Sequence, residues 1–117
     1  MILGFIGFGE VGFELARGLK QEGLTEIIAF DPMSNDSRFG PLVLERAGEA
    51  GVALVNSPLE ITAAADVIIA AVPGSKALPV ALNIAASLRS GQIYADVSTS
   101  TAASKKKMAE AIESGGA

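Results

Sequence analysis

The amino-acid sequence predicts an α/β domain, a doubly wound parallel sheet of about five strands with helices on both faces. Short aliphatic runs alternate along the chain with segments whose apolar residues recur at helical spacing. Half of the residues are hydrophobic, with five Phe, one Tyr and no Trp, which suits aliphatic strands buried under helices. The length of 117 residues is that of one domain with a single core.

The first half of the chain supplies three of the expected strands, at residues 2–6, 26–31 and 52–55. A helix is expected from Glu10 to about Glu22, where Val11, Leu15 and Leu19 recur at helical spacing, and Gly23 closes it. The polar stretch 33–40 reads as a loop. A short helix is expected over 41–48.

The second half continues the alternation. Ser57 is expected to cap a brief helix, with Pro58 in its first turn and Glu60 completing a capping box. The further elements expected are strands at 67–72 and 92–97, a helix at 78–88 with Pro79 in its first turn, and a helix at 101–113. The fifth strand is expected to leave an open edge, where another segment or another copy of the chain could pair as a homodimer.

Composition excludes several classes of function. Nine Lys and Arg against thirteen Asp and Glu give a net charge of −4, so no basic footprint for nucleic acid exists. The chain has no Cys and no His, which excludes thiolate or imidazole metal sites and a Ser–His–Asp triad. It also has no signal-peptide pattern and no uncharged apolar run of about 18 residues. A cytoplasmic protein without membrane contact is expected.

The most informative segment joins the first strand to the first helix. Gly7, Gly9 and Gly12 form a G-x-G-x-x-G pattern, with Phe8, Glu10 and Val11 between them. Such a turn lets the backbone approach a pyrophosphate, which the free amides at the helix start then bind. A bare glycine pattern also fits a flexible turn, but its place between a strand and a helix favours a Rossmann dinucleotide site. The Glu10 side chain is expected to point into solvent.

Asp31 ends the second predicted strand, nineteen residues after Gly12. A carboxylate at this place accepts hydrogen bonds from the adenosine ribose and repels a 2′-phosphate, which favours NAD. NADP is not excluded, because Ser34, Asn35 and Arg38 lie in the following loop and an arginine there can hold the 2′-phosphate.

Four motifs, in order along the chain, resemble the nucleotide-binding domain of the β-hydroxyacid dehydrogenases, the group of 6-phosphogluconate and 3-hydroxyisobutyrate dehydrogenases. Gly4 to Gly12 resembles the opening G-x-I-G-x-G-x-M-G, with Val11 in place of Met. The other three are the S-P-x-E segment at 57–60 with the A-D-V-I strand at 65–68, the V-P pair Val72-Pro73, and the D-x-S-T motif at 96–99.

The resemblance implies a role for each matching residue. Val72 and Pro73 would lie along the cofactor, and Ser98 and Thr99 would hold carboxylate or hydroxyl groups of the substrate near the nicotinamide. Ser98, Thr99 and Ser100 could also cap the last helix, and both roles together are favoured. The family usually has Pro shortly after this motif, where this chain has Thr101-Ala102-Ala103.

The resemblance also implies that residues 1–117 are one dinucleotide-binding domain of an NAD(P)-dependent enzyme that transfers a hydride from a β-hydroxyacid. The family's catalytic Lys lies in a helical second domain, so no catalytic residue is expected in this chain and the fragment alone would be inactive. Lys76 and Lys105 to Lys107 are expected on solvated helix faces. The alternatives are a stand-alone NAD-sensing regulatory domain without catalysis and a scaffold that binds nothing.

Overall fold

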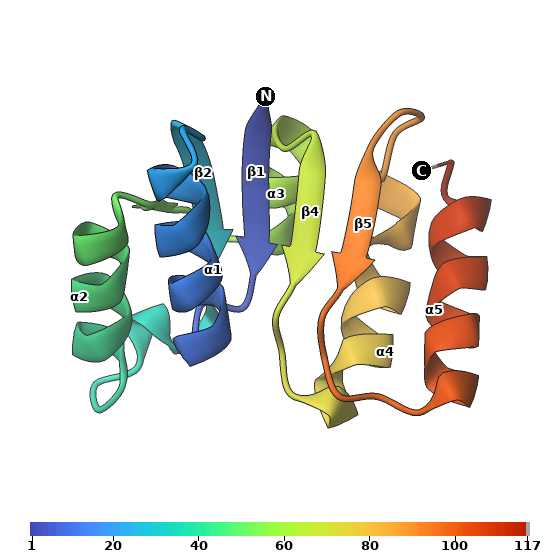
Figure 1. The fold of residues 1–117 in the computed structure, drawn as a ribbon. Helices are drawn as coiled ribbons and strands as arrows, with labels where there is room; N and C mark the ends of the chain where they lie inside the picture. Colours follow the sequence, from blue (N-terminus) through green and yellow to red (C-terminus); the bar gives the residue numbers. More distant parts are fainter. Residues whose placement is uncertain (117) are drawn as a thin grey trace.

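One sheet of five parallel strands organises the computed structural model, which describes residues 1–116 (Figure 1). Its strand order is β3-β2-β1-β4-β5, and each neighbouring pair is parallel. The strands are β1 (Ile2–Ile6), β2 (Glu26–Phe30), β3 (Ala53–Leu54), β4 (Val67–Ala70) and β5 (Ile93–Asp96). The predicted doubly wound Rossmann architecture is therefore confirmed.

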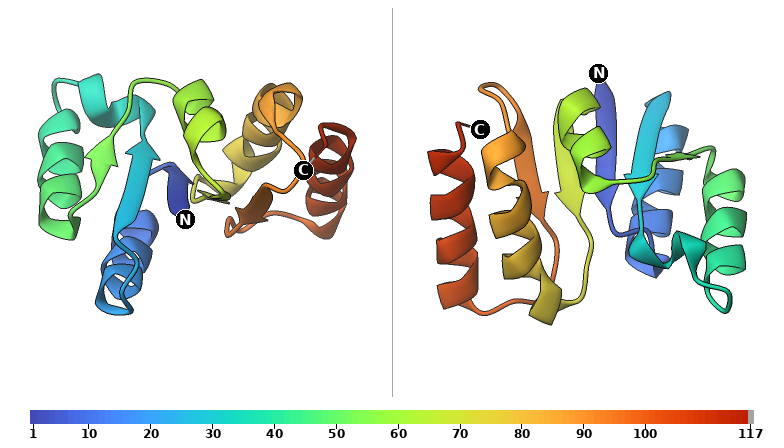
Figure 2. Two further views of the ribbon diagram at one scale, coloured as in Figure 1. Left: turned by 90° about the horizontal axis from the view of Figure 1, so that it is seen from above. Right: turned by 180° about the vertical axis from the view of Figure 1, so that it is seen from behind.

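Helices cover both faces of the sheet (Figure 2). The helices are α1 (Glu10–Gln21), α2 (Gly40–Ala50), α3 (Pro58–Ala64), α4 (Gly74–Ile84) and α5 (Ala102–Ser114), with 3₁₀ turns η1 (Pro32–Asn35) and η2 (Ala85–Ser87). Ala16 of α1 and Ala47 of α2 pack against Phe5 on one face. On the other face, α3, α4 and α5 pack against β1 and β4 through residues that include Ile61, Ile84 and Met108.

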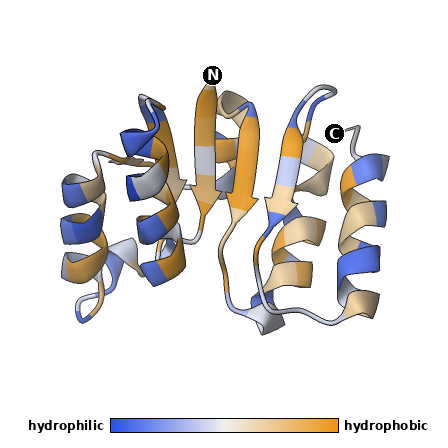
Figure 3. Ribbon diagram, in the orientation of Figure 1, coloured by the Kyte–Doolittle hydropathy of each residue, from blue (hydrophilic) through white to orange (hydrophobic). Residues whose placement is uncertain are grey.

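The hydropathy of the chain follows these layers, with mostly hydrophobic central strands between helices that carry both hydrophilic and hydrophobic residues (Figure 3). In β1, Leu3 and Phe5 belong to the core under α1 and α2, whereas Ile6 belongs to the opposite core. This alternation is what a strand buried on both faces requires. None of the helices within residues 1–116 is long and apolar enough to cross a membrane.

Helix α4 begins at Gly74, four residues before the predicted start, and so Pro79 lies inside it rather than in its first turn. A Cβ on Gly74 would overlap the Thr99 carbonyl oxygen, so glycine permits the helix start to approach the loop after β5. Pro79 removes one backbone donor from the helix, which nevertheless continues to Ile84. The predicted boundary is wrong because a proline can also lie inside a helix, here five residues after its start.

The expected capping box at α3 is also only partly correct. Ser57 is the N-cap residue, but its side chain makes no capping hydrogen bond. The Glu60 carboxylate accepts a hydrogen bond from the Asn56 amide at 2.8 Å, one residue before the N-cap. Two further differences are that β2 ends at Phe30, one residue early, and that the predicted loop 33–40 includes most of η1.

Strand β5 is the last strand of the sheet in the part of the chain described. Ile93 is 60% exposed and Val97, just beyond the strand, is 45% exposed. A groove of about 410 Å³ runs between this strand and α5, lined in part by Tyr94 and Met108. The expected open edge is therefore present within residues 1–116.

The close packing of α3 on β1 predicts that alanine at Gly4 and alanine at Gly18 change the free energy of unfolding in opposite directions. A Cβ on Gly4 would lie 2.7 Å from a methyl of Ile61 and 2.9 Å from Ala65, so Gly4→Ala overpacks the core. We expect it to lower the free energy of unfolding by about 1–3 kcal/mol. Gly18 lies within α1 with nothing within 4 Å of its Cβ position. Gly18→Ala should raise the same free energy by about 0.5–1 kcal/mol.

Urea unfolding of the two variants beside wild type measures both free energies. Equal midpoints for the two variants would contradict the packing described for Gly4.

Candidate functional site

The glycine turn between β1 and α1 has three distinct glycine roles. Gly7 has a φ of +90°, its amide donates to the Phe30 carbonyl at 2.7 Å, and a Cβ there would overlap the Ala71 carbonyl oxygen. Gly9 is the N-cap residue of α1, and the space around its Cβ position is open. A Cβ on Gly12 would lie 3.0 Å from the Gly7 carbonyl oxygen. The turn therefore leaves open space beside Gly9, at the start of α1.

Asp31 fixes this turn from the end of β2. One carboxylate oxygen accepts a hydrogen bond from the Phe8 amide at 2.8 Å, and the other accepts one from the Met33 amide at 2.8 Å. The residue is 8% exposed. Both interactions use a charged acceptor, which makes them stronger than ordinary amide hydrogen bonds. Each oxygen keeps further acceptor capacity for a ligand hydroxyl.

A cavity of about 500 Å³ opens beside the turn, at the carboxyl ends of β1, β2 and β4. Its lining contains five of the residues that the sequence assigned to a cofactor: Gly7, Gly9, Asp31, Val72 and Pro73. Apolar side chains of Met33, Pro58 and Val80 add walls that suit a flat ring. Ligands of open α/β sheets bind at such crevices beyond the carboxyl ends of the strands.

Four other residues assigned to the cofactor do not line this cavity. The Phe8 side chain is fully buried and packs edge-on against Phe5, with ring centroids 5.9 Å apart, so only its backbone serves the turn. Gly12 is buried under the turn. Glu10 and Val11 are exposed at the start of α1, in agreement with the solvent position expected for Glu10.

Sequence reasoning missed the wall that α4 contributes. Lys76, Val80 and Asn83 all line the cavity, and they are spaced four and three residues apart on one helix face. Lys76 is exposed, as expected, yet it stands at the cavity and not on an outward face. This spacing predicts a shared helix face only if the helix starts near Gly74, whereas the sequence predicts a start at residue 78. Arg38 does not line the cavity; its guanidinium lies 5.4 Å from the Phe39 ring centroid.

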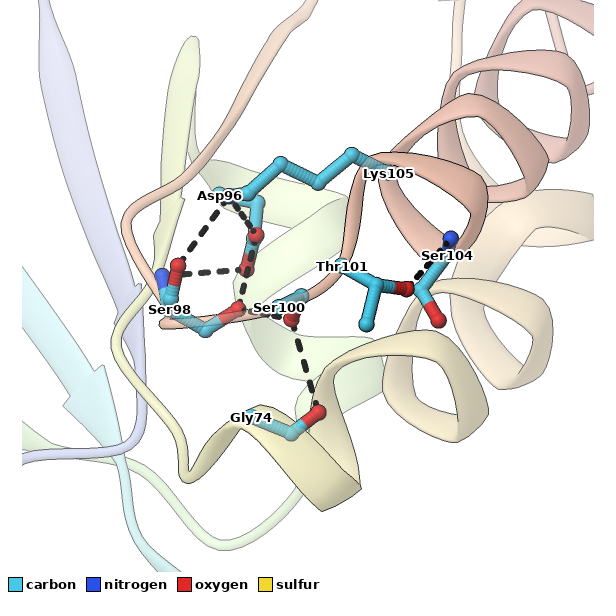
Figure 4. Close-up of polar contacts among 7 residues, drawn as sticks. All are labelled: Gly74, Asp96, Ser98, Ser100, Thr101, Ser104 and Lys105. Carbon is cyan, nitrogen blue, oxygen red and sulfur yellow. Dashed lines mark hydrogen bonds and ion pairs between the residues drawn. The ribbon is translucent and has the colours of Figure 1, made fainter.

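A second polar cluster follows β5 (Figure 4). The Ser98 hydroxyl donates to the Asp96 carboxylate at 2.8 Å, and the Ser98 and Ser100 hydroxyl oxygens are 2.6 Å apart. Lys105 of α5 donates to Asp96 at 2.8 Å and to the Ser98 carbonyl at 3.0 Å. Lys105 is exposed, as expected for a solvated helix face, but it also pairs with Asp96, which the sequence did not predict.

The cap of α5 differs from the expectation as well. The Thr101 hydroxyl accepts the Ser104 amide hydrogen bond at 3.1 Å, so Thr101 caps the helix and Ser98, Thr99 and Ser100 do not. Ser98 and Thr99 also lie outside the lining of the cavity. Burial raises the pKa of Asp96, but hydrogen bonds from Lys105 and Ser98 and the Lys105 charge outweigh burial and hold that pKa below its ordinary value.

The two amides held by Asp31 predict the result of Asp31→Asn. An asparagine offers one acceptor oxygen, so either the buried Phe8 amide or the part-buried Met33 amide faces an NH₂ group and loses its acceptor. We expect the free energy of unfolding to fall by about 1–3 kcal/mol, measured by urea unfolding. Asp36→Asn is the matched control, because a single Asp36 oxygen accepts both the Arg38 and Phe39 amides. Equal losses in the two variants would contradict this account of Asp31.

Comparisons with known proteins agree with this geometry. Residues 2–117 match the family profile described as the NAD binding domain of 6-phosphogluconate dehydrogenase. A conserved hypothetical protein from Sinorhizobium meliloti 1021 is 30% identical with a TM-score of 0.89, over 99% of this chain and 38% of that one. The 3-hydroxyisobutyrate dehydrogenase of Mycobacterium tuberculosis is 26% identical with a TM-score of 0.82, over 99% and 38% of the two chains.

An imine reductase from a Pseudomonas species shares the fold, with 22% identity and a TM-score of 0.75 over 97% of this chain and 37% of that one. No curated protein sequence matches the chain. The chain spans about 38% of the length of the first two solved structures. Because the family match extends from residue 2 to residue 117, the chain belongs to the family of NAD-binding domains found in 6-phosphogluconate dehydrogenase.

Proposed function

We propose that this chain is the cofactor domain of an NAD(P)-dependent β-hydroxyacid dehydrogenase. The observation that carries the proposal is the cavity at the carboxyl edge of the sheet, where the glycine turn, Asp31 and Val72-Pro73 lie together. A dinucleotide bound there supplies the hydride acceptor for oxidation of a hydroxyl carbon. The protein contributes binding and orientation. This reading is favoured over a stand-alone NAD sensor by the D-x-S-T motif at 96–99.

The residues of the cavity suit the parts of a dinucleotide. The free amides of the first turn of α1, near Glu10 and Val11, would bind the pyrophosphate beside the open face of Gly9. Asp31 would accept hydrogen bonds from the adenosine ribose with its remaining lone pairs. Its negative charge disfavours a 2′-phosphate, so NAD is the proposed cofactor. NADP stays the alternative cofactor, because Lys76 brings a positive charge to the cavity wall.

The proposed substrate contacts and the proposed location of the catalytic Lys rest on the family resemblance and on the share of the neighbour's length that this chain covers. Ser98 and Thr99 would contact a small hydroxyacid near the nicotinamide. The proton acceptor for the hydroxyl would be a Lys in a helical domain outside residues 1–117, since this chain covers 38% of the length of its 3-hydroxyisobutyrate dehydrogenase neighbour. The 117-residue chain alone would then bind nucleotide without turning over a hydroxyacid.

The proposed setting is the cytoplasm, because a chain without cysteine needs no oxidising compartment. A homodimer paired along the free edge of β5 is also part of the proposal, since that edge offers unpaired backbone groups.

Titration of the 117-residue chain with NADH, followed by nucleotide fluorescence, tests cofactor binding; the chain has no Trp to add background. We expect saturable binding, tighter for NADH than for NADPH because of Asp31. Gly9→Ala should weaken NADH binding by about tenfold or more, since its methyl group enters the space required by the pyrophosphate.

Gly18→Ala, on α1 away from the cavity lining, serves as the control and should bind as wild type does. The proposal fails if wild type does not bind NADH, or if Gly9→Ala binds it unchanged.

A further inference from the structure

Lys105 joins three parts of the segment that follows β5. Its ammonium group donates to the Asp96 carboxylate at the end of β5 and to the Ser98 carbonyl in the loop, while Lys105 itself stands on the first turns of α5 (Figure 4). The Asp96 side chain is 10% exposed and the Lys105 side chain is 42% exposed. The pair therefore has one nearly buried partner, and its geometry is fixed by two hydrogen bonds from a single donor group.

Counting protons fixes the direction of the hydrogen bonds around Ser98. An ionised Asp96 only accepts, so the Ser98 hydroxyl uses its single proton to donate a hydrogen bond to Asp96 Oδ2 at 2.8 Å. In the contact at 2.6 Å between Ser98 and Ser100, the donor must then be Ser100. Its other acceptor, the Gly74 carbonyl, is farther away at 3.4 Å. The chain of hydrogen bonds runs from Ser100 through Ser98 to Asp96.

We propose that Lys105 is a positioning residue for the substrate-facing segment: it fixes the Asp96 carboxylate, which accepts the hydrogen bond of the Ser98 hydroxyl, so that Ser98 Oγ meets a ligand only as an acceptor, with the lone pair that Ser100 does not use. This inference rests on the proposed function, in which Ser98 contacts the substrate. An acceptor binds a hydroxyl group of the substrate and not its carboxylate. The carboxylate of the hydroxyacid is then bound by other groups.

Other charged and titratable groups near Asp96 do not replace Lys105. The groove beside β5 and α5 is lined by Tyr94, Asp96, Lys105 and Glu113 among its titratable residues. Burial and the neighbouring Asp96 charge raise the pKa of Tyr94, so the phenol is neutral at pH 7. Glu113 carries the same sign of charge as Asp96. Among the groups that line the groove, Lys105 alone supplies a positive charge to the carboxylate.

The role of Lys105 is tested in the 117-residue chain without nucleotide, so that its outcome is independent of NADH binding. The Asp96 carboxyl titration is followed by carbon NMR, and exchange of the Ser98 and Thr99 amides is followed by hydrogen exchange. Lys105→Met should move the Asp96 midpoint to higher pH and speed this exchange by about tenfold. Lys105→Arg should restore both, and Lys106→Met, at the adjacent exposed position, should change neither.

An unchanged Asp96 midpoint in Lys105→Met, or the same change in Lys106→Met, would overturn the role given to Lys105. The acceptor role of Ser98 has its own probe pair, 3-hydroxypropionate and propionate, which differ only in the hydroxyl group. With NAD⁺ present, 3-hydroxypropionate should shift the Ser98 amide resonance and propionate should not. Equal shifts from both acids, or a shift from neither, would overturn the acceptor role. Failure of wild type to bind NADH would instead reject the proposed function.

Discussion

The hydrogen bond from the Phe8 amide to the Asp31 carboxylate connects the two parts of the chain on which the cavity depends. Phe8 lies in the turn after β1, and Asp31 follows β2. Together with the bond from the Gly7 amide to the Phe30 carbonyl, it fixes the turn against the end of the neighbouring strand. The Phe8 ring anchors the same turn in the core below. The turn beside the cavity is therefore held by one backbone hydrogen bond, by the Asp31 carboxylate and by the Phe8 ring.

Parallel pairing explains why residues distant in sequence meet at this edge. The carboxyl ends of β1, β2, β4 and β5 all point the same way, so the loops that follow them share one edge of the sheet. Glycine then sets how closely the loops approach. Gly7 lies against Ala71, and Gly74 lies against Thr99, at distances that no side chain would allow. The loop after β4 is thus in contact with both the glycine turn and the segment of Ser98.

The sequence was sufficient for features with a local signal. Strand and helix alternation follows from periodicity, and the glycine turn with Asp31 follows from spacing along the chain. Features that depend on tertiary contact were missed. The start of α4 at Gly74 lies against Thr99, twenty-five residues later, and Lys105 pairs with Asp96 across the start of α5. Lys76 lines the cavity from the first turn of α4, which the helix predicted at 78–88 does not include.

The double hydrogen bonding of Asp31 has a consequence for changing cofactor preference by protein engineering. Exchange of this acidic residue for a basic one is the direct route toward a 2′-phosphate, but it would remove the acceptors of two backbone amides at once. A basic side chain has no acceptor to replace them. A redesign that keeps Asp31 and adds positive charge on α4, where Lys76 lines the cavity, would leave both amides with their acceptors. The proposed preference for NAD and the shape of the turn would therefore depend on the same carboxylate.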